Sequence, residues 1–189
     1  GIDKIDSGEI LLNGKPVKFD NFREAIKNGF GLVPESRKTQ GVVQLLSVQK
    51  NVCMVNMDKL ARLGFLSGKL EKSYSEQYVE KLDIVTPSVD TEVQYLSGGN
   101  QQKVVIAKWL FKDSDIIFLD EPTRGIDVGS KSEIYLLIND LVRQGKVVII
   151  ISSELPEIIG MCDRILVMHE GELKGELDNE EATQEKILE

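Results

Sequence analysis

Cysteine and histidine are nearly missing from this chain, and negative charge outweighs positive charge. The two cysteines, Cys53 and Cys162, lie far apart and form no C-x-x-C pair, so we interpret both as buried, reduced thiols. The only histidine, His169, precedes Glu170-Gly171, a pair typical of a hairpin turn, and we expect it to be exposed and structural. The net charge of −8 argues against broad nucleic-acid binding, which needs a basic surface to neutralise phosphates.

Long hydrophobic runs are also lacking. The longest one, residues 147–151, is far too short to span a bilayer. The 189 residues are 41% hydrophobic and 29% charged, which is typical of a globular domain with a sizeable core. The sequence begins with Gly1 rather than methionine, as a fragment of a longer protein or a processed chain would.

Two runs of residues point to chemistry. Residues 96–103 read Leu-Ser-Gly-Gly-Asn-Gln-Gln-Lys, a glycine-rich turn that opens a helix. A helix N-terminus presents unpaired N–H groups and the positive end of the helix dipole, and both suit a phosphate. Asp120 and Glu121 close an apolar strand at residues 116–119, and two carboxylates at a strand tip suit a magnesium ion and an activated water. Together the runs predict a protein that handles a nucleoside triphosphate.

Each run also has a simpler explanation. Ser97 is a good N-cap, so the first run could be an ordinary helix start. Asp120 could cap a loop, and Glu121 could be a surface acid. The apolar strand before these acids favours a ligand site, because α/β sheets bind ligands at the carboxyl ends of their strands. Asp127 fits the N-cap of the following helix whatever else it does.

Strands alternate with helices along the chain and predict an α/β fold with a mostly parallel sheet. The expected strands, after two short ones around an Asn-Gly turn, cover residues 30–33, 115–119, 147–151 and 164–168. The expected helices cover residues 22–28, 71–82, 97–112, 132–144 and 155–161. We interpret residues 36–95 as a helical subdomain, and residues 1–35 and 96–189 as the α/β core.

At the two runs the sequence resembles the ABC-type ATPases. Leu-Ser-Gly-Gly-Asn is similar to that family's signature motif, and residues 120–123, Asp-Glu-Pro-Thr, resemble the end of its Walker B strand. The resemblance implies a P-loop NTPase-like fold with ATP and Mg²⁺ as cofactors. It implies that Asp120 helps to hold magnesium, that Glu121 is at the general-base position, and that Asp127 lies in a D-loop between two ATPase domains. The nucleotide-binding residues that the resemblance implies are Ser97, Gly98, Gly99, Asn100, Gln101, Asp127, Glu35 and Glu154.

No Gly-Lys pair of this sequence completes a P-loop. That motif needs G-x-x-x-x-G-K followed by Ser or Thr, and the lysines at 15, 69 and 146 do not fit. In the family, a segment like residues 6–10 comes shortly after the P-loop helix. We therefore expect a fold that is incomplete at its N-terminus and lacks a core strand and helix.

Two departures from the usual family pattern narrow the resemblance. Glu35, in Pro-Glu-Ser-Arg, lies at the hinge of the helical subdomain where the family commonly has Gln. Residues 152–154, Ser-Ser-Glu, stand where the family has a switch His. Both resemble the C-terminal ATPase half of bacterial simple-sugar importers, and residues 168–171 and 182–185 favour the ribose type. Such a half would supply its signature motif to ATP held by the N-terminal half of the same subunit, and we expect it to be inactive alone.

The resemblance also implies partners and a location. The partners would be the N-terminal ATPase half, the membrane permease subunits and, indirectly, a periplasmic sugar-binding protein, with no nucleic acid. The location would be peripheral, on the cytoplasmic face of the inner membrane. A non-hydrolysing module that docks a permease or partner ATPase is the alternative. A non-transport ABC protein, such as a ribosome-associated factor, is a third possibility, against which the acidic balance counts.

Overall fold

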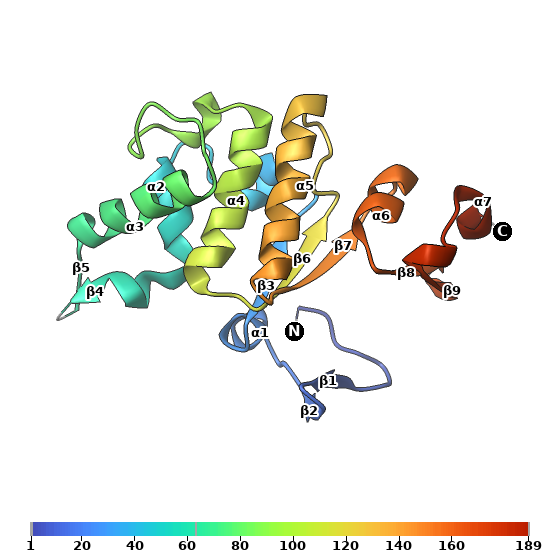
Figure 1. Ribbon diagram of the computed structural model, residues 1–189. Coiled ribbons are helices and arrows are strands. Elements are labelled where there is room, and N and C mark those ends of the chain that lie inside the picture. Colours follow the sequence, from blue (N-terminus) through green and yellow to red (C-terminus); the bar gives the residue numbers. More distant parts are fainter. Residues whose placement is uncertain (1, 63, 189) are drawn as a thin grey trace.

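The computed structural model describes residues 2–62 and 64–188, and its centre is a short parallel sheet (Figure 1). The strands lie in the order β3 (Phe30–Val33), β6 (Ile116–Asp120) and β7 (Val147–Ile151). Parallel neighbours need long crossover connections, and the helices between these strands provide them. The predicted α/β class with parallel strands is confirmed.

β7 differs from the expected buried strand. Val147, Ile149 and Ile151 are 54%, 39% and 50% exposed, whereas the side chains between them are half-buried. β7 is the last strand in the sheet order, so within the described residues nothing pairs with its outer edge. β3 is likewise only partly covered, because Leu32 is 47% exposed. The sheet therefore has one well-packed face, and its other face carries apolar side chains in contact with solvent.

The segment between β3 and the glycine-rich run is mainly helical, as expected, and it packs against the following helix. Its elements are the π-helical turn η1 (Arg37–Gly41), α2 (Val48–Cys53), the 3₁₀ segment η2 (Met54–Leu60), the hairpin of β4 (Ala61–Arg62) and β5 (Phe65–Leu66), α3 (Gly68–Lys81) and the 3₁₀ turn η3 (Val93–Tyr95). The sequence did not predict the hairpin. α3 begins before residue 71 because Ser67 caps it, accepting a hydrogen bond from the Leu70 N–H.

α4 (Gly98–Lys112) is the most buried element and confirms the helix predicted from the glycine-rich run. Phe111 has no exposed surface, and the rings of Tyr74 and Tyr78 pack against it. α5 (Val128–Arg143) lies beside α4 (Figure 1) and buries an apolar stripe of Ile134, Ile138 and Leu141. α5 begins earlier than predicted because Asp127 caps it. The candidate site lies at the N-terminal ends of these two packed helices.

The remaining elements lie around this centre. They are the hairpin of β1 (Ile10–Leu12) and β2 (Lys15–Val17), α1 (Phe22–Lys27), α6 (Leu155–Met161), the hairpin of β8 (Arg164–His169) and β9 (Glu172–Asp178), the 3₁₀ turn η4 (Asn179–Glu181) and α7 (Gln184–Leu188). β8 was expected as part of the alternating pattern, but it pairs antiparallel with β9 and lies outside the parallel sheet. His169 ends β8 and is exposed, as expected.

Both cysteines are free, but only Cys53 is buried, so the prediction of two buried thiols is wrong for the half-buried Cys162. Burial raises the pKa of Cys53 to about 12. Among the residues described, no helix is both long and apolar enough to cross a membrane.

Candidate functional site

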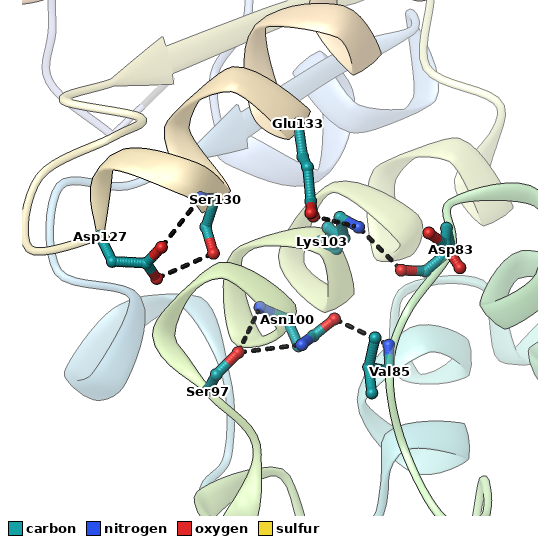
Figure 2. Close-up of polar contacts among 8 residues, drawn as sticks. All are labelled: Asp83, Val85, Ser97, Asn100, Lys103, Asp127, Ser130 and Glu133. Carbon is teal, nitrogen blue, oxygen red and sulfur yellow. Dashed lines mark hydrogen bonds and ion pairs between the residues drawn. The ribbon is translucent and has the colours of Figure 1, made fainter.

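Ser97 begins α4 and combines the capping role with an exposed position. Its hydroxyl oxygen accepts hydrogen bonds from Asn100, at 3.4 Å from the backbone N and 2.9 Å from Nδ2 (Figure 2). The Oδ1 of Asn100 accepts a 2.8 Å hydrogen bond from the Val85 N–H, which ties the helix start to a neighbouring loop. Ser97 only accepts in these contacts, so its own O–H remains available to donate to a ligand.

The two glycines after Ser97 allow other segments of the protein to come close. A Cβ on Gly98 would lie 2.8 Å from Nη2 of Arg37, and a Cβ on Gly99 would lie 2.7 Å from Cβ of Ser130. Sequence reasoning gave these glycines a role in the approach of an anion. The structure gives them a second role, because without them α5 and Arg37 could not pack against the start of α4.

Gln101 is buried, and its amide nitrogen donates to the carbonyls of Val93 and Leu96 at 3.2 and 3.1 Å. Its side chain therefore braces the segment that leads into α4. Asp127 accepts hydrogen bonds from the N–H and the hydroxyl of Ser130 at 3.0 and 2.8 Å (Figure 2). The N-cap explanation for Asp127 is thus correct, and the hydrogen bond from the Ser130 N–H lowers the pKa of its carboxyl.

Lys103 is a structural member of this region that the sequence analysis did not single out. It is only 4% exposed, and its Nζ lies 2.7 Å from the carbonyl of Asp83 and 2.9 Å from a carboxylate oxygen of Glu133 (Figure 2). It thereby joins α4 to α5 and to the loop before Val85. No clear signal in the sequence pointed to this role, because Lys103 follows the polar run Asn100–Gln102.

Asp120 and Glu121 lie at the carboxyl end of β6, where the sequence placed them. Both are half-buried. Glu121 has a φ of 47°, a left-handed conformation that is uncommon for residues other than glycine and is found often at functional sites. Its N–H donates to the Ile151 carbonyl at 2.8 Å, and its Oε1 accepts a 2.9 Å hydrogen bond from the N–H of Ser153. Within the described part of the chain, Asp120 makes no side-chain hydrogen bond.

Glu154 follows Ser153, whose N–H donates to Glu121, and belongs to the run 152–154 that the sequence analysis compared with a switch position. Both of its carboxylate oxygens lie within 2.8 Å of Nζ of Lys131, and this contact raises the pKa of Lys131. The first turn of α5 therefore touches both parts of the site, because Ser130 packs on Gly99 and Lys131 holds Glu154. No hydrogen bond or ion pair between described residues joins Glu121 directly to Ser97.

Glu35 is exposed and forms an ion pair with Arg124, just after the carboxyl end of β6. Arg37, two residues further on, contacts the same segment, and sequence reasoning assigned it no role. The hinge loop after β3 is therefore attached to the segment that links the acids to α5.

The site has two parts with different chemistry: hydrogen-bond donors at the start of α4, which suit phosphates, and carboxylates at the end of β6, which suit a magnesium ion. The start of α4 offers the Ser97 hydroxyl and the N–H groups of a helix N-terminus, a set of hydrogen-bond donors that suits phosphate. The end of β6 offers only two adjacent carboxylates, and no cluster of three or more metal-binding side chains occurs among the described residues. Mg²⁺ commonly uses one or two carboxylates together with substrate phosphates, so these acids fit a nucleotide-bound magnesium ion but no all-protein metal cage.

Comparisons with known sequences agree with the two motifs. The sequence profile described as ABC transporter matches residues 1–124. The chain is 50% identical over 188 residues to the ribose import ATP-binding protein RbsA of Oceanobacillus iheyensis, covering 100% of this chain and 38% of that protein. It is 53% identical over 181 residues to the xylose import ATP-binding protein XylG of Thermoanaerobacter pseudethanolicus, covering 96% of this chain and 36% of that protein. The chain thus spans little more than a third of these relatives.

Comparisons with solved structures give the same fold. The structure of CbiO1 from Clostridium perfringens, part of the ABC transporter complex CbiONQ, has a TM-score of 0.77 at 26% identity and covers 100% of this chain and 72% of its own. A dimeric ATP-binding cassette, MJ0796, bound to ADP and phosphate after hydrolysis, has a TM-score of 0.76 at 23% identity, with 94% and 76% coverage. The expected fold class is confirmed.

Proposed function

The chain belongs to the ABC transporter family, and from this premise we propose that it is the C-terminal ATPase half of a bacterial simple-sugar importer's ATP-binding subunit. The names of its relatives, ribose and xylose import ATP-binding proteins, support a simple sugar as cargo. The observation that carries the proposal is the start of α4, where an exposed serine and a helix N-terminus are held in place by Asn100, Ser130 and Arg37.

The role of this half is to present that helix start to ATP bound by the N-terminal half of the same subunit. The Ser97 hydroxyl would donate a hydrogen bond to a terminal phosphate oxygen, and the α4 dipole would favour the phosphate charge. The contacts of Asn100 with Ser97 and Val85 hold the serine before any nucleotide arrives. Pre-positioned donors stabilise developing charge without reorganising during the reaction.

The second nucleotide site of the subunit would include Asp120 and Glu121 of this half. When bound there, Mg²⁺ would neutralise phosphate charge, and Asp120, half-buried and without a side-chain hydrogen bond to the described residues, would help to hold it. Glu121 stands at the general-base position, but Ser153 already donates a hydrogen bond to its carboxylate. Lys131 holds Glu154, in the Ser-Ser-Glu run that stands where the family has a switch histidine. We infer that this second site is the less active one.

The hinge loop around Glu35 and the helical segment after it would face the membrane permease. We propose that the subunit is peripheral, on the cytoplasmic face of the inner membrane, with a periplasmic sugar-binding protein as an indirect partner. The Glu35–Arg124 ion pair supports a link between this loop and the end of β6.

The proposal is tested by two substitutions in the complete two-half subunit with its permease. Ser97→Arg places a long side chain at the helix start and should nearly abolish transport-coupled ATP hydrolysis. Glu121→Gln should reduce hydrolysis less, because Glu121 faces the less active site. Hydrolysis that survives Ser97→Arg but stops with Glu121→Gln would place the chemistry in this half and refute the proposal.

A non-hydrolysing docking module is the second candidate. The occupied carboxylates of Glu121 and Glu154 favour it, because both already have partners within the chain. In that case neither substitution would change hydrolysis, while both variants would still bind the permease.

A further inference from the structure

Arg37 meets three segments of the candidate site at one point. It opens the π-helical turn Arg37–Gly41, which follows the hinge residue Glu35. Its Nη1 donates to the carbonyl of Arg124 at 2.7 Å, and its Nη2 donates to the carbonyl of Gly125 at 2.8 Å. The same Nη2 lies 2.8 Å from the position that a Cβ on Gly98 would occupy. One guanidinium thus spans the hinge loop, the segment after the acids and the start of α4.

The contacts around Arg37 differ in strength. The nearby Glu35–Arg124 ion pair joins side chains that are 49% and 64% exposed, and solvent weakens such pairs. The two hydrogen bonds of Arg37 are charge-assisted, and its planar fork fits two carbonyls at fixed positions. Gly125 has a φ of 65°, so the backbone that carries these carbonyls has a left-handed conformation suited to glycine.

The far end of the same turn is fixed to the middle of α4. The Nζ of Lys108 donates to the carbonyl of Gly41 at 2.6 Å. A Cβ on Gly41 would lie only 2.9 Å from Cγ2 of Val105, so the backbone of the turn packs directly on the helix. A movement of the hinge loop that dislodged Arg37 would therefore act on the start of α4 and on residues 124–125 together.

The Nε of Arg37 adds an independent observation. This atom is buried and has no hydrogen-bond partner among the described residues. Buried donors are nearly always satisfied, so this arrangement carries a cost.

We propose that Arg37 is a positioning residue that couples the hinge loop to both nucleotide-facing segments, the signature start at Ser97–Gly99 and the stretch 124–127. The proposal rests on the proposed function, in which these segments meet ATP and the hinge loop meets the permease. With Arg37 seated, the carbonyls of Arg124 and Gly125 and the backbone of Gly98 are held around one side chain. Release of Arg37 frees both segments at once. Arg37 itself touches no reacting group.

The first test uses this chain alone and measures amide hydrogen exchange in Arg37→Met and in the milder Arg37→Lys. Exchange at residues 97–101 and 124–127 should rise about tenfold in Arg37→Met, as expected when a charge-assisted hydrogen bond is lost, and less in Arg37→Lys. Arg143→Met is the matched control, because Arg143 pairs only with the exposed Asp140 on α5. The proposed link would be wrong if amide exchange at these residues stayed unchanged in Arg37→Met, or if exchange in α3 rose by the same factor.

The second test uses the complete subunit and measures how strongly the permease stimulates ATP hydrolysis. The ratio of stimulated to basal hydrolysis should fall about fivefold or more in Arg37→Met, which is the lower range of allosteric coupling. An unchanged ratio would overturn the coupling role. If Ser97→Arg leaves hydrolysis intact in the same assay, the proposed function fails, and the exchange result on the chain alone still decides whether Arg37 links the segments.

Discussion

α4 and β7 both border the candidate site, but they differ strongly in how far their side chains are buried. α4 buries most of its side chains against α2, α3 and α5, and its first turn is held by contacts from three other segments. β7 leaves Val147, Ile149 and Ile151 open to solvent on one face of the sheet, and no described strand pairs with its outer edge. The donors at the start of α4 are thus positioned by the chain itself. The acids beside β7 lie next to an open edge, so we expect their final environment to need further protein.

The largest difference should appear when a buried side chain of α4 is compared with an exposed one of β7. Phe111→Ala removes a fully buried ring and should lower the free energy of unfolding by about 3–5 kcal/mol. Ile149→Ala, at a side chain that is 39% exposed, should cost less than about 1 kcal/mol. Denaturant unfolding measures both. If the two substitutions lowered the free energy of unfolding equally, the exposed face of β7 would be covered in solution.

A methyl group at the signature start should have the next largest effect. Gly99→Ala places a Cβ 2.7 Å from Cβ of Ser130 and should destabilise the protein by about 1–3 kcal/mol through overpacking. Gly160→Ala is the control, because no atom lies within 4 Å of its new Cβ in α6. Combining Gly99→Ala with Ser130→Gly should restore part of the loss. If Gly99→Ala melts like the unmodified chain, α5 does not pack as closely as described.

Loss of the buried cation between α4 and α5 should destabilise the protein by a similar amount. Lys103→Met keeps the apolar stem but removes the hydrogen bond to the Asp83 carbonyl and the ion pair with Glu133, at a cost of about 1.5–3 kcal/mol. Lys72→Met, which breaks an ion pair between two exposed side chains, should cost about 0–1 kcal/mol. Thermal melts measure both variants. Equal melting midpoints would contradict the expected difference in stability between Lys103→Met and Lys72→Met.

Lys108 should produce a small effect of pH. Burial lowers its pKa from 10.5 to about 8, so the unfolded chain binds more protons than the folded one between these values. Stability therefore rises with pH in this window, by at most about 1.4 kcal/mol per pH unit. Cys53 acts in the opposite direction, since its raised pKa makes stability fall above pH 9.0. The melting temperature of the unmodified chain should be higher at pH 9 than at pH 8. The melting temperature of Lys108→Met should be the same at both pH values.

The sequence predicted most helices and strands because local signals agreed with packing. Ser97 and Asp127 cap α4 and α5, and the apolar stripe of α5 has the expected helical spacing. The short hairpin at residues 61–66 was missed, because its few residues carry no strand periodicity. The exposure of Ile149 was also missed, since an apolar run does not reveal whether a partner covers it.

Parts of the site could be predicted only where a motif names the residue. Ser97, Asp120 and Glu121 were found from their motifs. Arg37 and Lys103 were not singled out, because their roles depend on backbone carbonyls distant in sequence, at Gly125 and Asp83. Carbonyl acceptors carry no residue-type signal, so such contacts emerge only from the folded arrangement.

The most direct test of the central claim is a calorimetric titration of this chain with Mg²⁺ and ATP. In the proposed function, the chain contributes the start of α4 to a nucleotide that another part of the protein holds. A helix N-terminus contributes about 0.3–1 kcal/mol to anion binding, and up to ~2 kcal/mol in good geometry. Millimolar affinity already needs about 4 kcal/mol, so no saturable binding tighter than about millimolar is expected. Micromolar binding would contradict the account, because the chain would then hold ATP by itself.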